Sequence, residues 1–337
     1  MIGMAVAFVV ALSITWAATP WVLRLALRAG AVAVPRARDV HDKPVPRWGG
    51  IAIYAGVVAA SCLALTYRHW RTGGDSGWNW HLAGVMVAAT FIALVGLVDD
   101  LRDLRAAWQA LGILAAGAIL VAFGVRIEGV TNPLVAAPPG AYNPAQWIAL
   151  SPIVSVAATL FWVFLVTKTV DAIDGLDGLA AGVCAISAAT LALVAAASRQ
   201  PEGPSLALVA AAVAGGCIGF LRHNYNPARI FMSTVGAQFL GFLLAALSIL
   251  GTYKLAAAAS VFIPVLVLGV PIVDYGIVLL KRLAQRAPLT AADRRHLHHR
   301  LLDRGLSHRQ AVWVIYGCTA ALCLAALFVF ELSRQAP

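Results

Sequence analysis

The sequence predicts an all-α integral membrane protein with about ten transmembrane helices. Of its 337 residues, 61% are hydrophobic and only 12% are charged, and the mean hydropathy is +0.83. These values lie outside the range of soluble globular proteins. A bilayer-spanning helix needs about 20 mostly apolar residues, and ten segments approach or exceed that length. Lysine and arginine are also distributed unevenly among the loops between these segments.

The ten apolar segments follow one another without a separate soluble domain, so residues 1–337 are predicted to form one polytopic domain. The expected spans are residues 2–27, 48–67, 82–98, 106–125, 148–167, 179–197, 205–221, 235–252, 255–280 and 311–332. The loops on one side of the membrane are then residues 28–47, 99–105, 168–178, 222–234 and 281–310.

These five loops hold 18 of the 25 lysines and arginines. The positive-inside rule therefore places them in the cytoplasm and both termini on the extracytoplasmic side. The topology also explains most of the net charge of +10. Because the basic residues lie in short loops between spans, the sequence gives little support to nucleic-acid binding. All the polar motifs fall on the same predicted cytoplasmic face.

Acidic residues follow two of the apolar segments directly. They are Asp99, Asp100 and Asp103, and then Asp171, Asp174 and Asp177. An acid at the bilayer centre costs roughly 2.5 to 3.5 kcal/mol, so acids beside apolar spans need a reason. Carboxylates that share a divalent cation and act on a charged substrate are the usual one. The alternatives are a solvated helix end and a glycine-rich turn with exposed acids.

Two basic motifs lie on the same predicted face. Arg294-Arg295-His296-Leu297-His298-His299-Arg300 combines guanidinium groups, which match phosphate oxygens, with imidazoles. The high density of arginine disfavours a zinc site, and a positive-inside loop with incidental histidines is the alternative. His41-Asp42-Lys43-Pro44-Val45-Pro46-Arg47-Trp48-Gly49-Gly50 offers Lys43 and Arg47 to phosphate, and its paired glycines permit tight packing. A rigid basic loop that only helps topology is the alternative there.

Together these motifs resemble the polyprenyl-phosphate N-acetylhexosamine-1-phosphate transferases. The resemblance runs from about residue 36 to 316, in the order H-x-K-P-x-P-R-x-G-G, V-G-x-x-D-D-x-x-D-L, I-D-G-L-D-G-L-A-A-G, N-P-A-x-I-F-M and H-L-H-H-R-L-L. It implies a ten-helix fold in the bacterial plasma membrane with an active site on the cytoplasmic face. It also implies Mg²⁺ as cofactor, a UDP-N-acetylhexosamine donor, undecaprenyl phosphate as acceptor and UMP as product.

The resemblance also implies roles for individual residues. The predicted catalytic residues are Asp99, Asp100, Asp174, Asp177 and His298. The predicted substrate-binding residues are Lys43, Arg47, Asp103, Asn226, Arg295, His296, His299 and Arg300. The predicted metal ligands are Asp99 and Asp100, which the resemblance implies, and Asp171, which is a departure from the family pattern.

The chain departs from the family pattern at two places. Family members usually continue N-P-A-x-I-F-M with G-D-x-G-S, and Thr234 stands here where that aspartate is expected. Two asparagines usually precede the D-G-L-D-G stretch, and this chain has Lys168 and Asp171 instead. One carboxylate is lost and another is gained, so our hypothesis is that Asp171 replaces the missing metal ligand.

Two other functions remain as alternatives. A catalytically degenerate relative would bind lipid phosphate or nucleotide sugar without turnover, with Lys168 supplying a charge in place of the cation. A transporter that uses intramembrane acids fits less well, because the acids cluster at one face and no duplicated half is visible. The sequence leaves open Mn²⁺ in place of Mg²⁺, a homodimer, and the identity of the hexosamine.

Overall fold

The structure is a computed structural model that describes residues 1–33, 44–73, 79–131, 147–198, 200–252, 259–286 and 296–335. The helices in these ranges are α1 (Ile2–Arg28), α2 (Gly49–Arg71), α3 (Trp80–Arg102), α4 (Ala106–Ala122), α5 (Pro152–Ile173), α6 (Leu179–Ala197), α7 (Gly203–Asn224), α8 (Ser233–Thr252), α9 (Ala259–Val267), α10 (Gly269–Ala284), α11 (Leu297–Asp303) and α12 (His308–Gln335). The strands are β1 (Val32–Ala33), β2 (Val45–Pro46), β3 (Gly129–Thr131) and β4 (Trp147–Ala149). They form two small antiparallel pairs, β1 with β2 and β3 with β4.

Within the described ranges, eight helices are long and apolar enough to cross a membrane. They are α1, α2, α3, α5, α6, α7, α8 and α12. Helix α4 is apolar but has only 17 residues. The prediction of a helical multi-pass membrane protein is therefore confirmed, and each of the ten predicted segments overlaps helix. The number of spans and their orientation toward the cytoplasm stay predictions.

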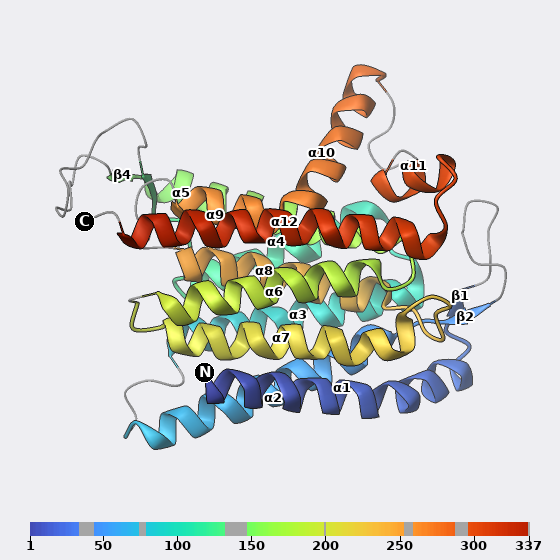
Figure 1. The fold of residues 1–337 in the computed structure, drawn as a ribbon, viewed down its shortest axis with the longest axis horizontal. Coiled ribbons are helices and arrows are strands. Elements are labelled where there is room, and N and C mark those ends of the chain that lie inside the picture. The colour runs from blue at the N-terminus through green and yellow to red at the C-terminus, as the bar shows by residue number, and fades with distance from the viewer. Residues whose placement is uncertain are drawn as a thin grey trace.

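The ninth predicted segment, residues 255–280, is wrong as a single helix. The described part of it divides at Leu268 into α9 and α10, and α10 leaves the bundle at a steep angle (Figure 1). Pro271 has no N–H to donate to the carbonyl of Val267 four residues earlier, so the helix loses one bond of its ladder. The hydroxyl of Ser187 on α6 donates to that carbonyl oxygen over 2.8 Å instead.

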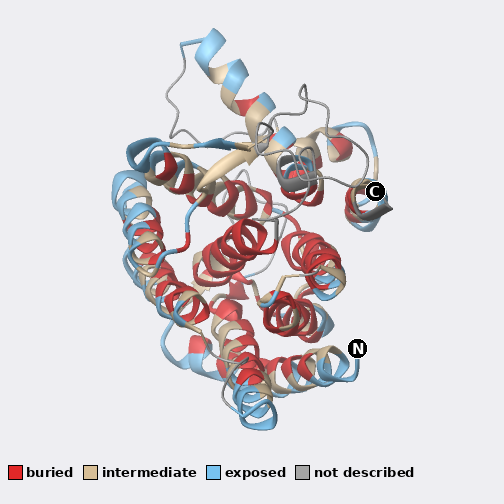
Figure 2. Ribbon diagram, turned by 90° about the vertical axis from the view of Figure 1, so that its left-hand side faces the viewer, coloured by how far each residue is buried: buried red, intermediate tan, exposed pale blue. Residues whose placement is uncertain are grey.

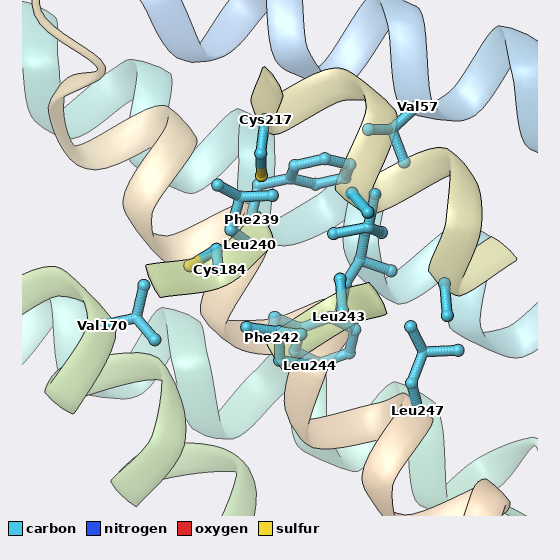
Figure 3. Packing of buried hydrophobic residues seen from close by; sticks show 14 of the residues in the cluster. Val57, Val170, Cys184, Cys217, Phe239, Leu240, Phe242, Leu243, Leu244 and Leu247 are labelled. Atoms are coloured by element: carbon cyan, nitrogen blue, oxygen red, sulfur yellow. The ribbon is translucent and has the colours of Figure 1, made fainter. Parts of the chain in front are cut away.

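Helix α8 forms the centre of the molecule. Viewed along the bundle, buried residues gather on the inner helices, while the outer helices expose one face (Figure 2). Almost every residue of α8 is buried, against α2, α3, α5, α6 and α7. The core around it is drawn in Figure 3 and includes Phe239, Leu240, Phe242, Leu243, Leu244 and Leu247 of α8, with Val57, Val170, Cys184 and Cys217 of its neighbours. An apolar helix enclosed in this way gives the site a rigid base.

The predicted polar motifs meet at one end of the bundle. Helix α1 begins and α12 ends at one end, and the β1–β2 pair and α11 lie at the other (Figure 1). At this second end a Cβ on Gly50 of α2 would come within 2.1 Å of the Gly236 nitrogen on α8. A Cβ on Gly96 of α3 would meet the backbone of Val235 at 2.6 Å. The tight packing predicted for the paired glycines is thus confirmed at Gly50, and it brings α2 and α3 onto the first turn of α8.

Candidate active site

The first turn of α8 holds a carboxylate from α3. Asp100 lies in the last turn of α3 and accepts hydrogen bonds from the backbone N–H groups of Thr234 (3.2 Å) and Val235 (3.3 Å). The first N–H groups of a helix have no partner inside the helix and carry partial positive charge, so they stabilise an anion. Asp100 is thereby fixed in place at the start of α8.

A second carboxylate reaches the same turn from α5. Asp174 ends α5 as its C-cap residue and accepts a hydrogen bond from the Ser233 N–H. The pKa of Asp174 is raised to about 7, mainly by burial and also by the negative charges of Asp171, Asp100 and Asp177. The charges that act most strongly on Asp174 are therefore all negative, and its ionised form needs a cation.

These two carboxylates suit a magnesium ion that is shared with a substrate. In the part of the chain that the structure describes, no group of three His, Cys, Asp or Glu side chains is arranged to hold a metal alone. Mg²⁺ is commonly bound by only one or two carboxylates and completes its shell with water and substrate phosphates. Asp100 and Asp174 offer hard oxygen donors and lie close enough for their charges to interact. The donor set therefore fits Mg²⁺ with ligands supplied by the substrate.

Asp177 fixes the loop between α7 and α8. Its Oδ2 accepts hydrogen bonds from the Asn226 side-chain amide (2.9 Å) and from the Ala228 N–H (3.0 Å). For the stretch from Asp171 to Gly178, the sequence offers a glycine-rich turn with exposed acids as the alternative to a functional site. Only Asp171 to Ile173 are helical, and the rest is the turn between α5 and α6. Its carboxylates are bonded in that turn and are not merely solvated.

Helix α12 contacts two connections, the α7–α8 loop and the α5–α6 turn. The guanidinium group of Arg309 donates to the Asn226 carbonyl oxygen at 2.8 Å. The hydroxyl of Tyr316 donates to the Gly178 carbonyl oxygen at 2.6 Å. Asn224 joins the two connections directly, because its side-chain oxygen accepts the Gly178 N–H at 2.9 Å. The predicted substrate-binding Asn226 is thus held on both its side chain and its backbone.

The motif around Arg47 pairs with the stretch that leads into α8. Gly49 N–H donates to the Phe231 carbonyl oxygen at 2.9 Å, and Phe231 N–H donates to the Pro46 carbonyl oxygen at 2.8 Å. This pairing brings the Arg47 guanidinium close enough to attract the Asp100 carboxylate. Arg47 also lies 3.7 Å from Asp103, whose side chain is 78% exposed. Arg47 is therefore a cation at the edge of the carboxylate pair, as its predicted contact with phosphate requires.

The other acids of the two motifs bind side chains. Asp99 Oδ1 accepts hydrogen bonds from the Gln109 side chain (2.9 Å) and the Leu104 N–H (3.0 Å). Lys168 donates to Gln109 Oε1 at 3.1 Å and forms an ion pair with Asp171. Asp99 and Asp171, both predicted metal ligands, are thus the two ends of one chain of contacts through Gln109 and Lys168. These contacts favour a positioning role for both, and metal binding by them stays a prediction.

The histidine motif reaches the α5–α6 turn. His298 is buried, and a Cβ on Gly175 would lie 2.6 Å from its Nε2 atom. Its ring centroid lies 5.7 Å from that of His296 and 4.3 Å from that of His299. The pKa of His298 is lowered to about 3, mainly by burial and also by His299 and His296. His298 is therefore neutral near pH 7. Arg300 lies in α11 itself, while Lys43 and Arg295 lie outside the described residues.

Sequence reasoning missed several residues that hold these groups. Gln109 connects Asp99 to Lys168, and Asp274 on α10 contacts His296 at 2.9 Å. Each carried a signal, because Gln109 is an amide in an apolar segment and Asp274 an acid in another. Arg309 and Tyr316 of α12 gave no comparable signal, since their partners are backbone carbonyl groups remote in the sequence.

Comparisons with known proteins identify the family of the chain. The family model of glycosyl transferase family 4 matches residues 82–252, which include Asp99, Asp100, Asp174 and Asp177. A probable undecaprenyl-phosphate N-acetylglucosaminyl 1-phosphate transferase of Bacillus subtilis (strain 168) is 37% identical over 316 residues, 94% of this chain and 82% of the relative.

More distant relatives cover almost as much of the chain. A decaprenyl-phosphate N-acetylglucosaminephosphotransferase of Mycolicibacterium smegmatis is 36% identical over 90% of this chain and 76% of its own length. A phospho-N-acetylmuramoyl-pentapeptide-transferase of a Synechococcus strain is 32% identical over 88% of this chain and 82% of its own length. With its apolar helices and the cluster of motifs at one end of the bundle, the chain belongs to glycosyl transferase family 4 and is a multi-pass transferase of the bacterial inner membrane.

Proposed function

We propose that the chain transfers a HexNAc-1-phosphate, specifically GlcNAc-1-phosphate, from a UDP-sugar to undecaprenyl phosphate, with Mg²⁺ as cofactor and UMP as product. This reaction would begin the synthesis of a cell-envelope polysaccharide. The acceptor and sugar follow the names of the Bacillus and Mycolicibacterium relatives. The observation that carries the proposal is the convergence of Asp100 and Asp174 on the first turn of α8, beside Arg47.

The reaction joins two anions, so electrostatics dominate the design of the site. An oxygen of the lipid phosphate attacks the phosphorus that carries the sugar. A new phosphorus–oxygen bond forms, the bond between the two phosphates of the donor breaks, and UMP leaves with that bridging oxygen. Phosphoryl transfer depends mainly on positioning and on charge stabilisation. A bound Mg²⁺ would neutralise charge on the phosphates that it shares.

Different residues of the site would bind the cation, the phosphates and the nucleotide sugar. Asp100 and Asp174 would hold the cation, and the N–H groups of α8 keep both carboxylates in position. Arg47 would bind a phosphate at the edge of the pair. The histidines of α11 would meet the donor diphosphate, and the neutral His298 can do so without repelling the cation. Asp177, through Asn226, would keep the α7–α8 loop beside the donor.

The test is turnover by the purified full-length chain in detergent. Undecaprenyl phosphate, UDP-GlcNAc and Mg²⁺ should give UMP, EDTA should abolish its release, and Asp100→Asn should reduce it strongly. Replacing UDP-GlcNAc by UDP-GalNAc tests the choice of sugar. Absence of UMP with every UDP-HexNAc, under conditions where the Bacillus relative is active, would refute the proposed transfer.

A second function has one specific observation in its favour. Thr234 replaces the aspartate expected at the start of α8, and it offers only its N–H to Asp100. A chain that binds lipid phosphate or nucleotide sugar without turnover would fit this loss. Binding of UDP-GlcNAc without release of UMP, together with UMP release by Thr234→Asp, would establish this second function in place of the first.

A further inference from the structure

Asp274 is a buried acid for which the proposed chemistry has no use. Its side chain is only 6% exposed. Both carboxylate oxygens have partners on the segment that carries the histidines: Oδ2 lies 2.9 Å from His296 Nδ1, and Oδ1 accepts the Leu297 N–H at 2.6 Å. Burying a carboxylate is costly, and these two contacts compensate for it. They place Asp274 at the start of α11.

The break between α9 and α10 brings Asp274 to this position. Because α10 departs from the direction of α9 at Leu268, the face that carries Asp274 turns toward α11 (Figure 1). Asp274 and His296 are 22 residues apart in the sequence, so their contact ties two separate elements together. The break between α9 and α10 and the buried carboxylate of Asp274 together fix the position of His296.

A carboxylate beside Nδ1 determines how a histidine presents its other nitrogen. When the ring carries a proton on each nitrogen, Nδ1–H donates a hydrogen bond to Asp274, and Nε2–H, on the opposite edge of the ring, can donate to an anionic ligand. The His296 ring stacks on that of His298 with only 5° between the planes. His298 in turn contacts Gly175, between Asp174 and Asp177. The row of rings therefore leads from Asp274 to the α5–α6 turn.

We propose that Asp274 is a positioning residue for the diphosphate of the nucleotide sugar. Its carboxylate fixes the orientation of His296 and stabilises the imidazolium form, so that Nε2–H points at the diphosphate oxygens, and it holds the start of α11 through Leu297. The inference rests on the proposed function, because it takes the donor to be a nucleoside diphosphate sugar. Asp274 touches no substrate itself and acts through His296.

The test compares Asp274→Asn with Asp303→Asn in the full-length chain in detergent. Asp303 lies in α11 and is exposed, so the control makes the same change of charge without changing the His296 contact. An asparagine amide can still contact Nδ1, but it carries no negative charge to stabilise the imidazolium form of His296. We expect Asp274→Asn to raise the KM for UDP-GlcNAc by about 10- to 100-fold. The KM for undecaprenyl phosphate should stay within about twofold, and Asp303→Asn should resemble the wild type.

A binding measurement separates this inference from the proposed function. UDP affinity, measured by calorimetry without turnover, should weaken in Asp274→Asn by the same factor as the KM, and Asp274→Glu should recover part of it. In the double variant with His296→Gln the two losses should not add. Equal changes in both KM values, or additive losses, would overturn the positioning role. A wild type that binds UDP-GlcNAc but releases no UMP would overturn only the proposed transfer.

Discussion

The acids of the two motifs form two groups with different partners. Asp100 and Asp174 accept backbone N–H groups from the first turn of α8. Asp99 and Asp171 contact the side chains of Gln109 and Lys168. Neighbouring positions on a helix point about 100° apart, so Asp99 faces α4 while Asp100 faces α8. Acids that look equivalent in the sequence therefore perform different tasks.

The difference is one of charge compensation. Asp171 is paired with an ammonium group, so its charge is balanced within the protein. The backbone N–H groups that hold Asp100 and Asp174 orient the carboxylates but carry only partial charge. The group on α8 therefore has charge left for a cation, and the group around Lys168 has little. A variant of each group should show which of them the reaction needs.

The largest effect should come from the group on α8. Asp100→Asn keeps the shape of the side chain but removes its charge, so the proposed cation loses a ligand. We expect kcat to fall by about 10³-fold, the upper end for loss of one electrostatic group. Asp99→Asn should lower kcat by less than about tenfold, because its partners are Gln109 and a backbone N–H. UMP release measured across a Mg²⁺ titration tests both variants.

Equal losses in the two variants, with equal shifts in the Mg²⁺ dependence, would contradict this division. They would restore Asp99 to the metal site that the sequence predicts for it. The purified variants should first be compared by thermal unfolding in detergent, so that a folding defect is not mistaken for a loss of charge.

The sequence predicted the class of fold but not the partners of the acids. Apolar length predicted a helical multi-pass membrane protein, because the thickness of a bilayer sets the length of a spanning helix. The break at Leu268 follows from Pro271, which is visible in the sequence but is tolerated within many membrane helices. The partners of the acids could not be predicted, since Gln109 and Ser233 are brought to them by packing between distant segments.

The second effect concerns the ion pair of Lys168 and Asp171. Lys168→Met should leave Asp171 without its cation, and Asp171→Asn should leave the ammonium group without its anion. Each change should cost about 1 to 3 kcal/mol of stability, the range for an unsatisfied buried polar group. The double variant should recover most of this loss, because neither charge remains. Thermal unfolding in detergent measures the coupling.

The same variants test whether Asp171 replaces the missing metal ligand. If it does, Asp171→Asn alone should raise the Mg²⁺ concentration for half-maximal activity, and the double variant should not reverse that rise. Our expectation is that the Mg²⁺ dependence of the double variant matches the wild type. A persistent rise would assign Asp171 to the cation and not to Lys168.

A smaller effect should follow from adding a carboxylate to the group on α8, which contains Asp100 and Asp174. Thr234→Asp places an acid in the first turn of α8, where the partial positive charge of the helix favours it. A third oxygen donor beside Asp100 and Asp174 should lower the half-maximal Mg²⁺ concentration by about tenfold, the equivalent of 1.4 kcal/mol. Thr234→Asn, which adds similar bulk without charge, is the matched control. An unchanged Mg²⁺ dependence would place Thr234 outside the cation site.

The smallest effect concerns His298, which lies against the turn between Asp174 and Asp177. Its pKa is about 3 in the folded chain, below its ordinary value of 6.5, because the ring is buried. Between these values the unfolded chain binds a proton that the folded chain excludes. The stability from burying the neutral ring is therefore complete above pH 6.5, and it decreases as the pH falls toward 3.

His298→Gln should remove this part of the pH dependence. The Tm of the wild type should fall more steeply than that of the variant from pH 7 to pH 5, with a difference in slope worth about 2–4 °C. His69→Gln changes an exposed histidine and should follow the wild type. Parallel curves for all three proteins would mean that His298 takes up its proton without leaving the turn. In that case the imidazole nearest the carboxylates would be a charged group in the folded chain, and it would compete with the cation.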